Sequence, residues 1–261
     1  MISEALTYHD NKNITIDQFL DILNWLYPTA ISQEFNLGLI GGEPTLHPEF
    51  TEILKYTNNF CSSTCSKSIL FTNGILLNQF LPLIGPNMFI LININNLQDS
   101  QKDKLLESLN NINALNWFTN QKVTLGCNLY LEEFNYTYFW DIIDKYSNIS
   151  LIRVSVTAPN SIELKKDKKK YYSLMKPIFL NFIKNALMRN ISLTYDCNQI
   201  PKCFFTPDEW ELIIQAGPPR GFCEPVIDIT PDFKATCCFG VYNTPIDCNM
   251  FDNINNLNHY F

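Results

Sequence analysis

Short apolar runs alternate with longer amphipathic stretches along most of the chain. The runs rich in Ile, Leu, Val and Phe predict strands, and stretches with apolar residues at helical spacing predict helices. The predicted strands span residues 35–41, 68–73, 88–94, 122–130, 151–157 and 191–196. The predicted helices span about residues 15–26, 48–58, 100–109, 135–146 and 171–189. This alternation is typical of repeated βα units, which wind into a parallel sheet that is open or closed into a barrel.

The first predicted strand runs into the sequence GGEP, and in βα folds the functional residues gather where strands end. Gly41 and Gly42 would let the backbone approach a ligand closely, and Glu43 would project at the carboxyl edge of the sheet. Pro44 would stiffen the loop that follows. The alternative interpretation is a plain strand-to-helix turn, with Glu43 as an acid near the start of the next helix.

Polar residues stand at the ends of three later predicted strands. Asn or Thr in these positions could hydrogen-bond ribose hydroxyls or a carboxylate, and backbone groups near Thr157 could bind adenine. The alternative is that Asn simply favours strand ends and turns. We expect His47 to form hydrogen bonds within its loop and not to bind a metal. The candidate residues are Thr72, Asn73, Asn93, Asn95 and Asn128.

Composition and charge narrow the class of protein. The chain has 261 residues, of which 46% are hydrophobic, so it can build a large core. Its net charge of −7 and pI near 5.0 argue against nucleic acid or an anionic membrane as the main partner. No apolar run approaches the roughly 18 residues of a membrane span, and no basic region followed by an apolar one opens the sequence. These features predict a cytoplasmic protein.

Nine cysteines are unusual in a protein of a reducing compartment, where a disulfide framework would not persist. Metal or iron–sulfur ligation is therefore the leading hypothesis, and buried apolar thiols are the alternative. Most of the cysteines crowd the last part of the chain: Cys197, Cys203, Cys223, Cys237, Cys238 and Cys248.

The segment "GGEPTLHPEF" after a strand resembles the GGE motif of the radical SAM superfamily. Later segments are similar to its third to sixth strands, in order: "LFTNG" (70–74), "LININ" (91–95), "VTLGCNLY" (123–130) and "LIRVSVTAP" (151–159). The resemblance implies a partial (β/α)6 TIM-type barrel over residues 1–196. It also implies that Glu43 and the neighbouring backbone bind the amino group of S-adenosylmethionine (SAM).

The CxxxCxxC motif of that superfamily is absent from its usual place before the GGE sequence, because Met1 to Ile40 contain no cysteine. Its three thiolates hold a 4Fe–4S cluster whose open iron binds SAM for cleavage. Residues 6–27 resemble the loop and helix that normally follow the motif, with Thr15 or Asp17 near the helix start. We therefore expect a truncated gene product or a degenerate family member.

The sequence "CSSTC" does not replace the missing motif. Cys61 and Cys65 precede the strand predicted at 68–73, which places them at the amino end of that strand, whereas Glu43 follows the carboxyl end of its own strand. We expect two ordinary cytosolic thiols.

The C-terminal segment "CEPVIDITPDFKATCC" (223–238) resembles the opening of a SPASM or twitch extension, in which a β-hairpin between cysteines binds an auxiliary 4Fe–4S cluster. Phe233 stands where that pattern has Gly, which puts the tightness of the turn in question. Residues 197–261 would then form an incomplete, small cysteine-rich β-hairpin extension. Zinc is the alternative metal for four thiolates. The expected ligands are Cys203, Cys223, Cys238 and Cys248.

The resemblance implies SAM-dependent radical chemistry, for peptide or natural-product modification or for enzyme maturation. A peptide or protein substrate and a reductant such as flavodoxin or ferredoxin would be its partners, and no catalytic residue is assigned. The alternative is a non-catalytic degenerate barrel that binds a peptide or partner protein and keeps one auxiliary metal site. An in-frame CxxxCxxC upstream of the Met1 codon would favour the enzyme, and a stop codon there would favour the binding protein.

Overall fold

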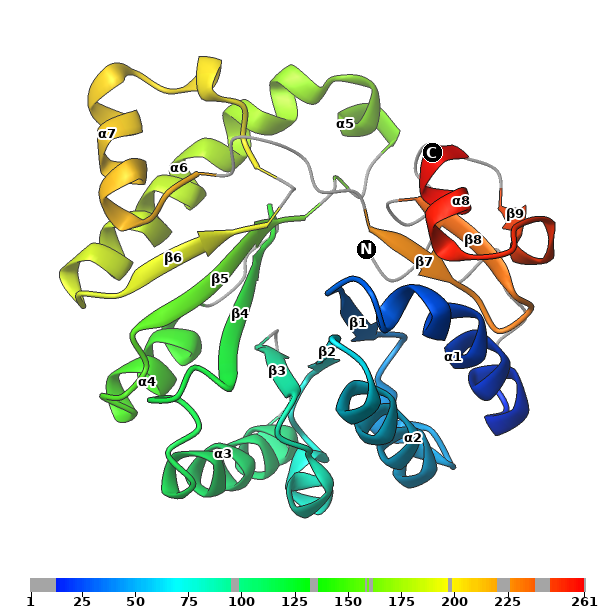
Figure 1. The fold of residues 1–261 in the computed structure, drawn as a ribbon. Helices are drawn as coiled ribbons and strands as arrows, with labels where there is room; N and C mark the ends of the chain where they lie inside the picture. Colours follow the sequence, from blue (N-terminus) through cyan, green and yellow to red (C-terminus); the bar gives the residue numbers. More distant parts are fainter. Residues whose placement is uncertain are drawn as a thin grey trace. The chain divides into compact units, whose positions relative to one another are not determined.

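Six parallel strands form the main sheet of the protein, in the order β1-β2-β3-β4-β5-β6 (Figure 1). The computed structural model describes residues 13–94, 99–131, 136–157, 159, 162–196, 199–219, 226–237 and 245–260. All six predicted strands and the parallel α/β class are confirmed, and closure into a barrel stays a prediction. The strands are β1 (Asn36–Leu39), β2 (Lys67–Thr72), β3 (Met88–Asn93), β4 (Val123–Leu129), β5 (Leu151–Val156) and β6 (Ser192–Tyr195).

The five predicted helices are also present, with their ends shifted by up to five residues. They are α1 (Ile16–Ala30), α2 (Phe50–Ser63), α3 (Asp99–Ala114), α4 (Thr137–Lys145) and α6 (Lys168–Met188). Three helices were not predicted: α5 (Ile162–Lys166), α7 (Pro207–Ala216) and α8 (Ile254–Tyr260). Short 3-10 helices are η2 (Pro44–Leu46), η3 (Leu77–Gln79), η4 (Leu81–Leu83), η5 (Lys202–Phe204) and η6 (Cys248–Met250).

The chain divides into two compact units. The first contains Met1–Phe71, Gln79–Phe89 and Glu224–Phe261, and the second contains Thr72–Asn78 and Ile90–Cys223. The C-terminal segment thus belongs to the same unit as the first helices. The division predicted between residues 196 and 197 stays a prediction.

In the first unit, α1 begins with a capping box and packs against the C-terminal segment. The Thr15 hydroxyl accepts a hydrogen bond from the Gln18 amide, and the Gln18 side chain accepts one from the Thr15 amide, which confirms Thr15 at the helix start. Further along α1, the Trp25 indole donates to the Phe251 carbonyl at 2.9 Å. Trp25 also packs against a cluster formed by the fully buried residues Ala235, Cys248 and Leu257.

A β-hairpin is present at the predicted turn and closes on an unusual residue, whereas the cysteine-rich extension stays a prediction. Strands β7 (Ile227–Ile229) and β8 (Lys234–Cys237) pair antiparallel, and β9 (Ile246–Asp247) pairs with β8. Phe233 has a φ of 56°, a left-handed conformation that normally favours Gly. Its ring packs edge to face against Trp25, with centroids 5.5 Å apart, so side-chain packing offsets the backbone cost. The hairpin's metal-binding role stays a prediction.

In the second unit, helices pack on one face of strands β3–β6 (Figure 1). Phe179 of α6 packs against Tyr195 of β6 with ring centroids 6.0 Å apart. The Tyr195 hydroxyl donates to the Ile213 carbonyl of α7 at 2.9 Å. At the end of α7, Gly217 lies directly against the backbone of Leu193, where a Cβ atom would meet the carbonyl oxygen at 1.9 Å.

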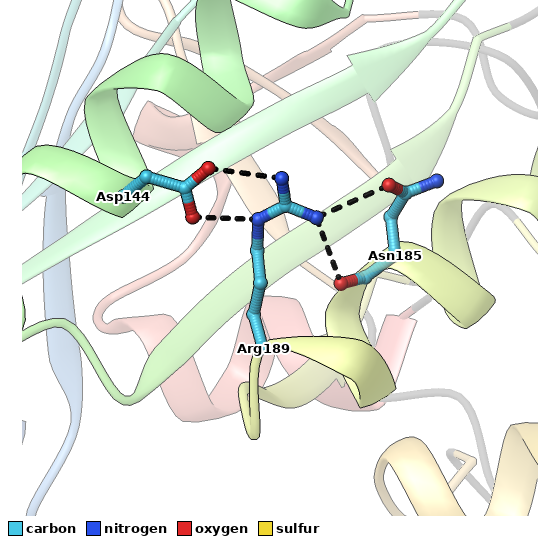
Figure 2. A network of polar contacts seen from close by, with 3 residues as sticks. All are labelled: Asp144, Asn185 and Arg189. Atoms are coloured by element: carbon cyan, nitrogen blue, oxygen red, sulfur yellow. Dashed lines mark hydrogen bonds and ion pairs between the residues drawn. The ribbon is translucent and has the colours of Figure 1, made fainter.

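A bidentate ion pair links α4 to the end of α6 on this helical side (Figure 2). Arg189 Nε and Nη2 donate to the two carboxylate oxygens of Asp144 at 2.7 and 2.9 Å. The same guanidinium donates to Asn185 and lies 4.9 Å from the ring centroid of Trp140. These contacts of Arg189 are with residues of α4 and α6, so the ion pair holds these two helices together.

No helix in the described part of the chain is both long and apolar enough to cross a lipid bilayer.

Candidate functional site

The loop after β1 carries two glycines that the described fold does not require. Gly41 and Gly42 are exposed, and neither has a positive φ. A Cβ atom added to either would meet no other atom within 4 Å. Ile40, just before them, is 51% exposed although it is apolar. Neither turn geometry nor internal packing explains this Gly-Gly pair, and an open backbone of this kind is suited to close approach by a ligand.

Glu43 is half-buried and is held in place by its own loop. Its Oε1 atom accepts hydrogen bonds from the Thr45 amide at 3.2 Å and from the Thr45 hydroxyl at 2.7 Å. Pro44 begins η2 directly after it. These bonds match the alternative interpretation, in which Glu43 caps the turn. They also fix the orientation of a carboxylate beside the exposed glycines, which is useful for binding a cation.

His47 has both ring nitrogens engaged within the first unit. The Glu49 amide donates to Nδ1 at 3.1 Å, so Nδ1 is the unprotonated nitrogen, and Nε2 then donates to the Ile14 carbonyl at 2.8 Å. The prediction that His47 is a hydrogen-bonding residue of its loop is confirmed.

At the end of β2, the predicted polar residues stabilise a turn. The Gly74 amide donates to the Thr72 hydroxyl at 3.1 Å, and the Ile75 amide donates to the Asn73 side-chain oxygen at 2.9 Å. Gly74 has a φ of 77°. This arrangement favours the alternative interpretation of Thr72 and Asn73 as turn residues, and ligand binding by either stays a prediction.

The backbone amide and carbonyl of Thr157 are both hydrogen-bonded within the second unit. Its amide donates to the Leu129 carbonyl at 3.0 Å, and its carbonyl accepts from the Tyr171 hydroxyl. Both groups thus have protein partners already, which weakens the expectation that they bind adenine. Asn95 lies outside the described residues, so nothing tests its predicted role.

Asn93, the last residue of β3, lies beside Gly126 of the neighbouring strand β4. A Cβ atom on Gly126 would come within 2.4 Å of the Asn93 side-chain oxygen. Glycine at position 126 therefore leaves room for the Asn93 amide group to extend over β4. Sequence reasoning did not single out Gly126, although a glycine inside a strand is a known sign of close approach.

The strand register places Asn93 in a polar row across the sheet. Gly126 of β4 pairs in register with Asn93 of β3 on one side and with Arg153 of β5 on the other side. Arg153 in turn pairs in register with Thr194 of β6. Side chains two residues further along each strand point to the same face. We call this set the polar face, and its described members are Asn93, Gly126, Asn128, Arg153, Ser155, Thr194 and Asp196.

Arg153 and Asp196 form an ion pair on the polar face. Arg153 Nη2 lies 2.5 Å from Asp196 Oδ2, and the two side chains are 29% and 21% exposed. Neither residue was predicted from the sequence as part of a site. Alternation in "LIRVSV" could have indicated that Arg153 points away from the apolar face, but its proximity to Asp196 depends on the pairing of β5 with β6.

The structure describes two of the four predicted metal ligands. Cys223 and Cys238 lie outside the described residues. Cys203 is an exposed residue of η5 in the second unit, whereas Cys248 is fully buried in the first unit. Burial, followed by the nearby carboxylates of Asp247 and Asp232, raises the pKa of Cys248 to about 11. In this environment the thiol is protonated at neutral pH, and the predicted ligand set stays a prediction.

The described residues do not fit a SAM-cleaving iron–sulfur cluster. No group of three His, Cys, Asp or Glu side chains that could hold a metal occurs among them. Cys61 is buried in α2, where burial raises the pKa of its thiol. Cys65 is exposed just before β2, whose Lys67 pairs with Asn36 at the start of β1. This confirms that "CSSTC" stands at the amino end of its strand.

No protein-family model matches the sequence, and no curated protein matches it significantly.

Proposed function

We propose that this chain binds SAM through the loop of residues 40–46, as its resemblance to radical SAM proteins implies. The observation that supports the proposal is the exposed Gly41–Gly42 pair next to the fixed carboxylate of Glu43, directly after the first strand of a parallel sheet. In this proposal the Glu43 carboxylate accepts a charge-assisted hydrogen bond from the methionyl ammonium group, and the glycine backbone lies against the ligand. The reaction class would be SAM-dependent radical modification of a peptide or protein.

A second candidate is favoured by a specific observation, the absence of a thiolate triad from the described residues. A degenerate barrel could bind SAM, a peptide or a partner protein without cleaving SAM.

Titration calorimetry with SAM tests the proposed binding. Wild-type protein should bind SAM, and Glu43→Gln should weaken binding at least tenfold because the amide cannot pair with the ammonium charge. Glu49→Gln is the matched control, since Glu49 is an exposed acid of the same region whose side chain does not cap α2. Absence of SAM binding at millimolar concentration, or equal binding by wild type and Glu43→Gln, would overturn the proposal.

Cleavage of SAM separates the two candidates. After anaerobic iron–sulfur reconstitution and dithionite reduction, 5′-deoxyadenosine should stay at background for the chain as it stands. Clear formation of that nucleoside would show that cluster ligands exist outside the described residues, and it would decide in favour of an enzyme.

Metal content tests the predicted C-terminal site. The double change Cys223→Ala with Cys238→Ala should remove bound iron or zinc, because loss of two of four ligands abolishes tight binding. Limited proteolysis should then cut residues 197–261 faster. The control change Cys61→Ala with Cys65→Ala should leave metal content unchanged in elemental analysis. Loss of metal from the control pair alone would move the site to "CSSTC".

A further inference from the structure

Strands β3–β6 depart from the usual composition of a parallel sheet on one face, toward their carboxyl ends. Two residues before this part of the face, β3 and β5 carry the apolar residues Leu91 and Leu151. Parallel strands are normally apolar on both faces because helices cover both. One face here follows that rule, with buried side chains that include Leu125, Ile152, Val154, Leu193 and Tyr195. The polar face instead carries amide, hydroxyl and charged side chains. The Arg153 and Asp196 side chains on this face are only partly buried, so a polar ligand can reach them.

We propose that the polar face binds a free α-amino acid in its zwitterionic form. The Arg153 guanidinium would take the carboxylate, and the Asp196 carboxylate would take the ammonium group. This site goes beyond the proposed SAM-binding loop, because all of its residues belong to the second unit and none belongs to residues 40–46.

The charges on the two side chains are spaced as such a ligand requires. Arg153 Nη2 and Asp196 Oδ2 are 2.5 Å apart, so opposite charges lie side by side on the sheet. An α-amino acid also carries opposite charges side by side, since one carbon separates its carboxylate from its ammonium group. If the ligand lies with its carboxylate at Arg153 and its ammonium group at Asp196, each ligand charge faces a side chain of the opposite sign. A planar guanidinium can bind more than one carboxylate, and Arg suits carboxylate recognition better than Lys does.

The neighbours of the pair supply neutral hydrogen-bonding groups. Gly126, next to Arg153 in the row, has no side chain, and the Asn93 amide group and Leu91 extend over it. Asn128 and Ser155 lie one row further toward the carboxyl edge and are opposite each other. Their side chains can donate to a carboxylate and accept from an ammonium group.

The Arg189–Asp144 pair of the same unit shows what a purely structural ion pair looks like (Figure 2). It bridges two helices, is bidentate, and shares its guanidinium with Asn185. The Arg153–Asp196 pair instead joins β5 to the residue that follows β6, and Arg153 pairs in register with Gly126. Arg189 is therefore a matched control for Arg153.

Ligand-observed NMR and calorimetry on the full chain with each of the twenty free α-amino acids test the proposal. At least one should bind. Its N-acetyl derivative, which lacks the ammonium group, and its carboxamide, which lacks the carboxylate, should each bind at least tenfold more weakly. Arg153→Gln and Asp196→Asn should each weaken binding at least tenfold, whereas Arg189→Gln should not. Circular dichroism confirms that each variant is folded.

Three results would overturn the inference: no amino acid binds, both blocked derivatives bind as well as the free form, or folded Arg153→Gln binds normally. SAM is itself an α-amino acid, so the titration is repeated in saturating SAM. Undiminished amino-acid binding supports two separate sites. Displacement by SAM would assign the Arg153–Asp196 pair to SAM, which overturns this inference and leaves the proposed function standing.

Discussion

Replacing Gly217 by alanine should destabilise the second unit through a clash between two backbone segments. An alanine Cβ would lie 1.9 Å from the Leu193 carbonyl oxygen, 2.9 Å from its carbon and 3.2 Å from its nitrogen. Real Cβ contacts do not fall below 3.0 Å, so the end of α7 and strand β6 must separate by about 1.1 Å (3.0 − 1.9). The φ of 167° is ordinary extended backbone, and steric contact is therefore the whole cause.

The magnitude follows from three contributions. Overpacking costs about 1–3 kcal/mol, and the upper part of that range applies because no side chain can rotate out of the way. Movement of α7 also strains the hydrogen bond from Tyr195 to the Ile213 carbonyl, which is worth about 1 kcal/mol. Alanine restricts the unfolded chain, which offsets about 0.4–1 kcal/mol. The net loss is about 2–3 kcal/mol, or a fall in Tm of roughly 4–12 °C.

Scanning calorimetry and urea unfolding followed by tryptophan fluorescence measure this loss, since Trp210 belongs to α7. Gly42→Ala is the matched control, because its Cβ would meet nothing within 4 Å and its free energy of unfolding should not fall. Equal stability of the two variants would refute the packing of α7 against β6 described above.

Two further changes test single interactions. Asp144→Asn should cost about 0.5 kcal/mol at pH 7, a small value because the Asp144 side chain is 54% exposed. The hydrogen bond from Arg189 lowers the pKa of Asp144, so the wild-type advantage is full above pH 4 and disappears as pH falls through the folded-state pKa. Urea midpoints between pH 2 and 7 check this, and a pH-independent difference would contradict it. At the hairpin, Phe233→Ala should be about 1 kcal/mol less stable than Phe233→Gly, because both lose the contact with Trp25 but only Gly tolerates a φ of 56° without strain. Thermal unfolding that ranks Ala above Gly would show that the turn relaxes.

The elements of the main sheet could be predicted because their signals are local. An apolar run between turn residues predicts a strand wherever that strand later pairs, and "VTLGCNLY" and "LIRVSV" needed no tertiary information to be recognised. The start of α1 was equally local, since Thr15 and Gln18 cap it from within one turn. The helix α7 was missed, although Thr206 and Glu209 form a similar capping box at its start.

The composition of the polar face depended on strand pairing, which no local pattern specifies. The alternation of side chains along β5 places Arg153 on the opposite face from its apolar neighbours. Only the register of β5 with β6 brings Arg153 to Asp196, 43 residues away. The same holds for Asn93 and Gly126, which meet because β3 and β4 pair in one register out of several possible ones.

Phe233 shows the same division between local and tertiary information. The local sequence predicted a turn at this position. The tightness of the turn was in question because the SPASM pattern, which this segment resembles, has Gly there. The structure resolves that doubt through Trp25, a residue of α1 far away in the sequence, whose ring packs against Phe233 and offsets the cost of the left-handed backbone. Short-range sterics and hydrophobic periodicity thus determined where strands, helices and turns occur. Contacts between segments distant in the chain decided which side chains meet, because their energies exist only after the chain has folded.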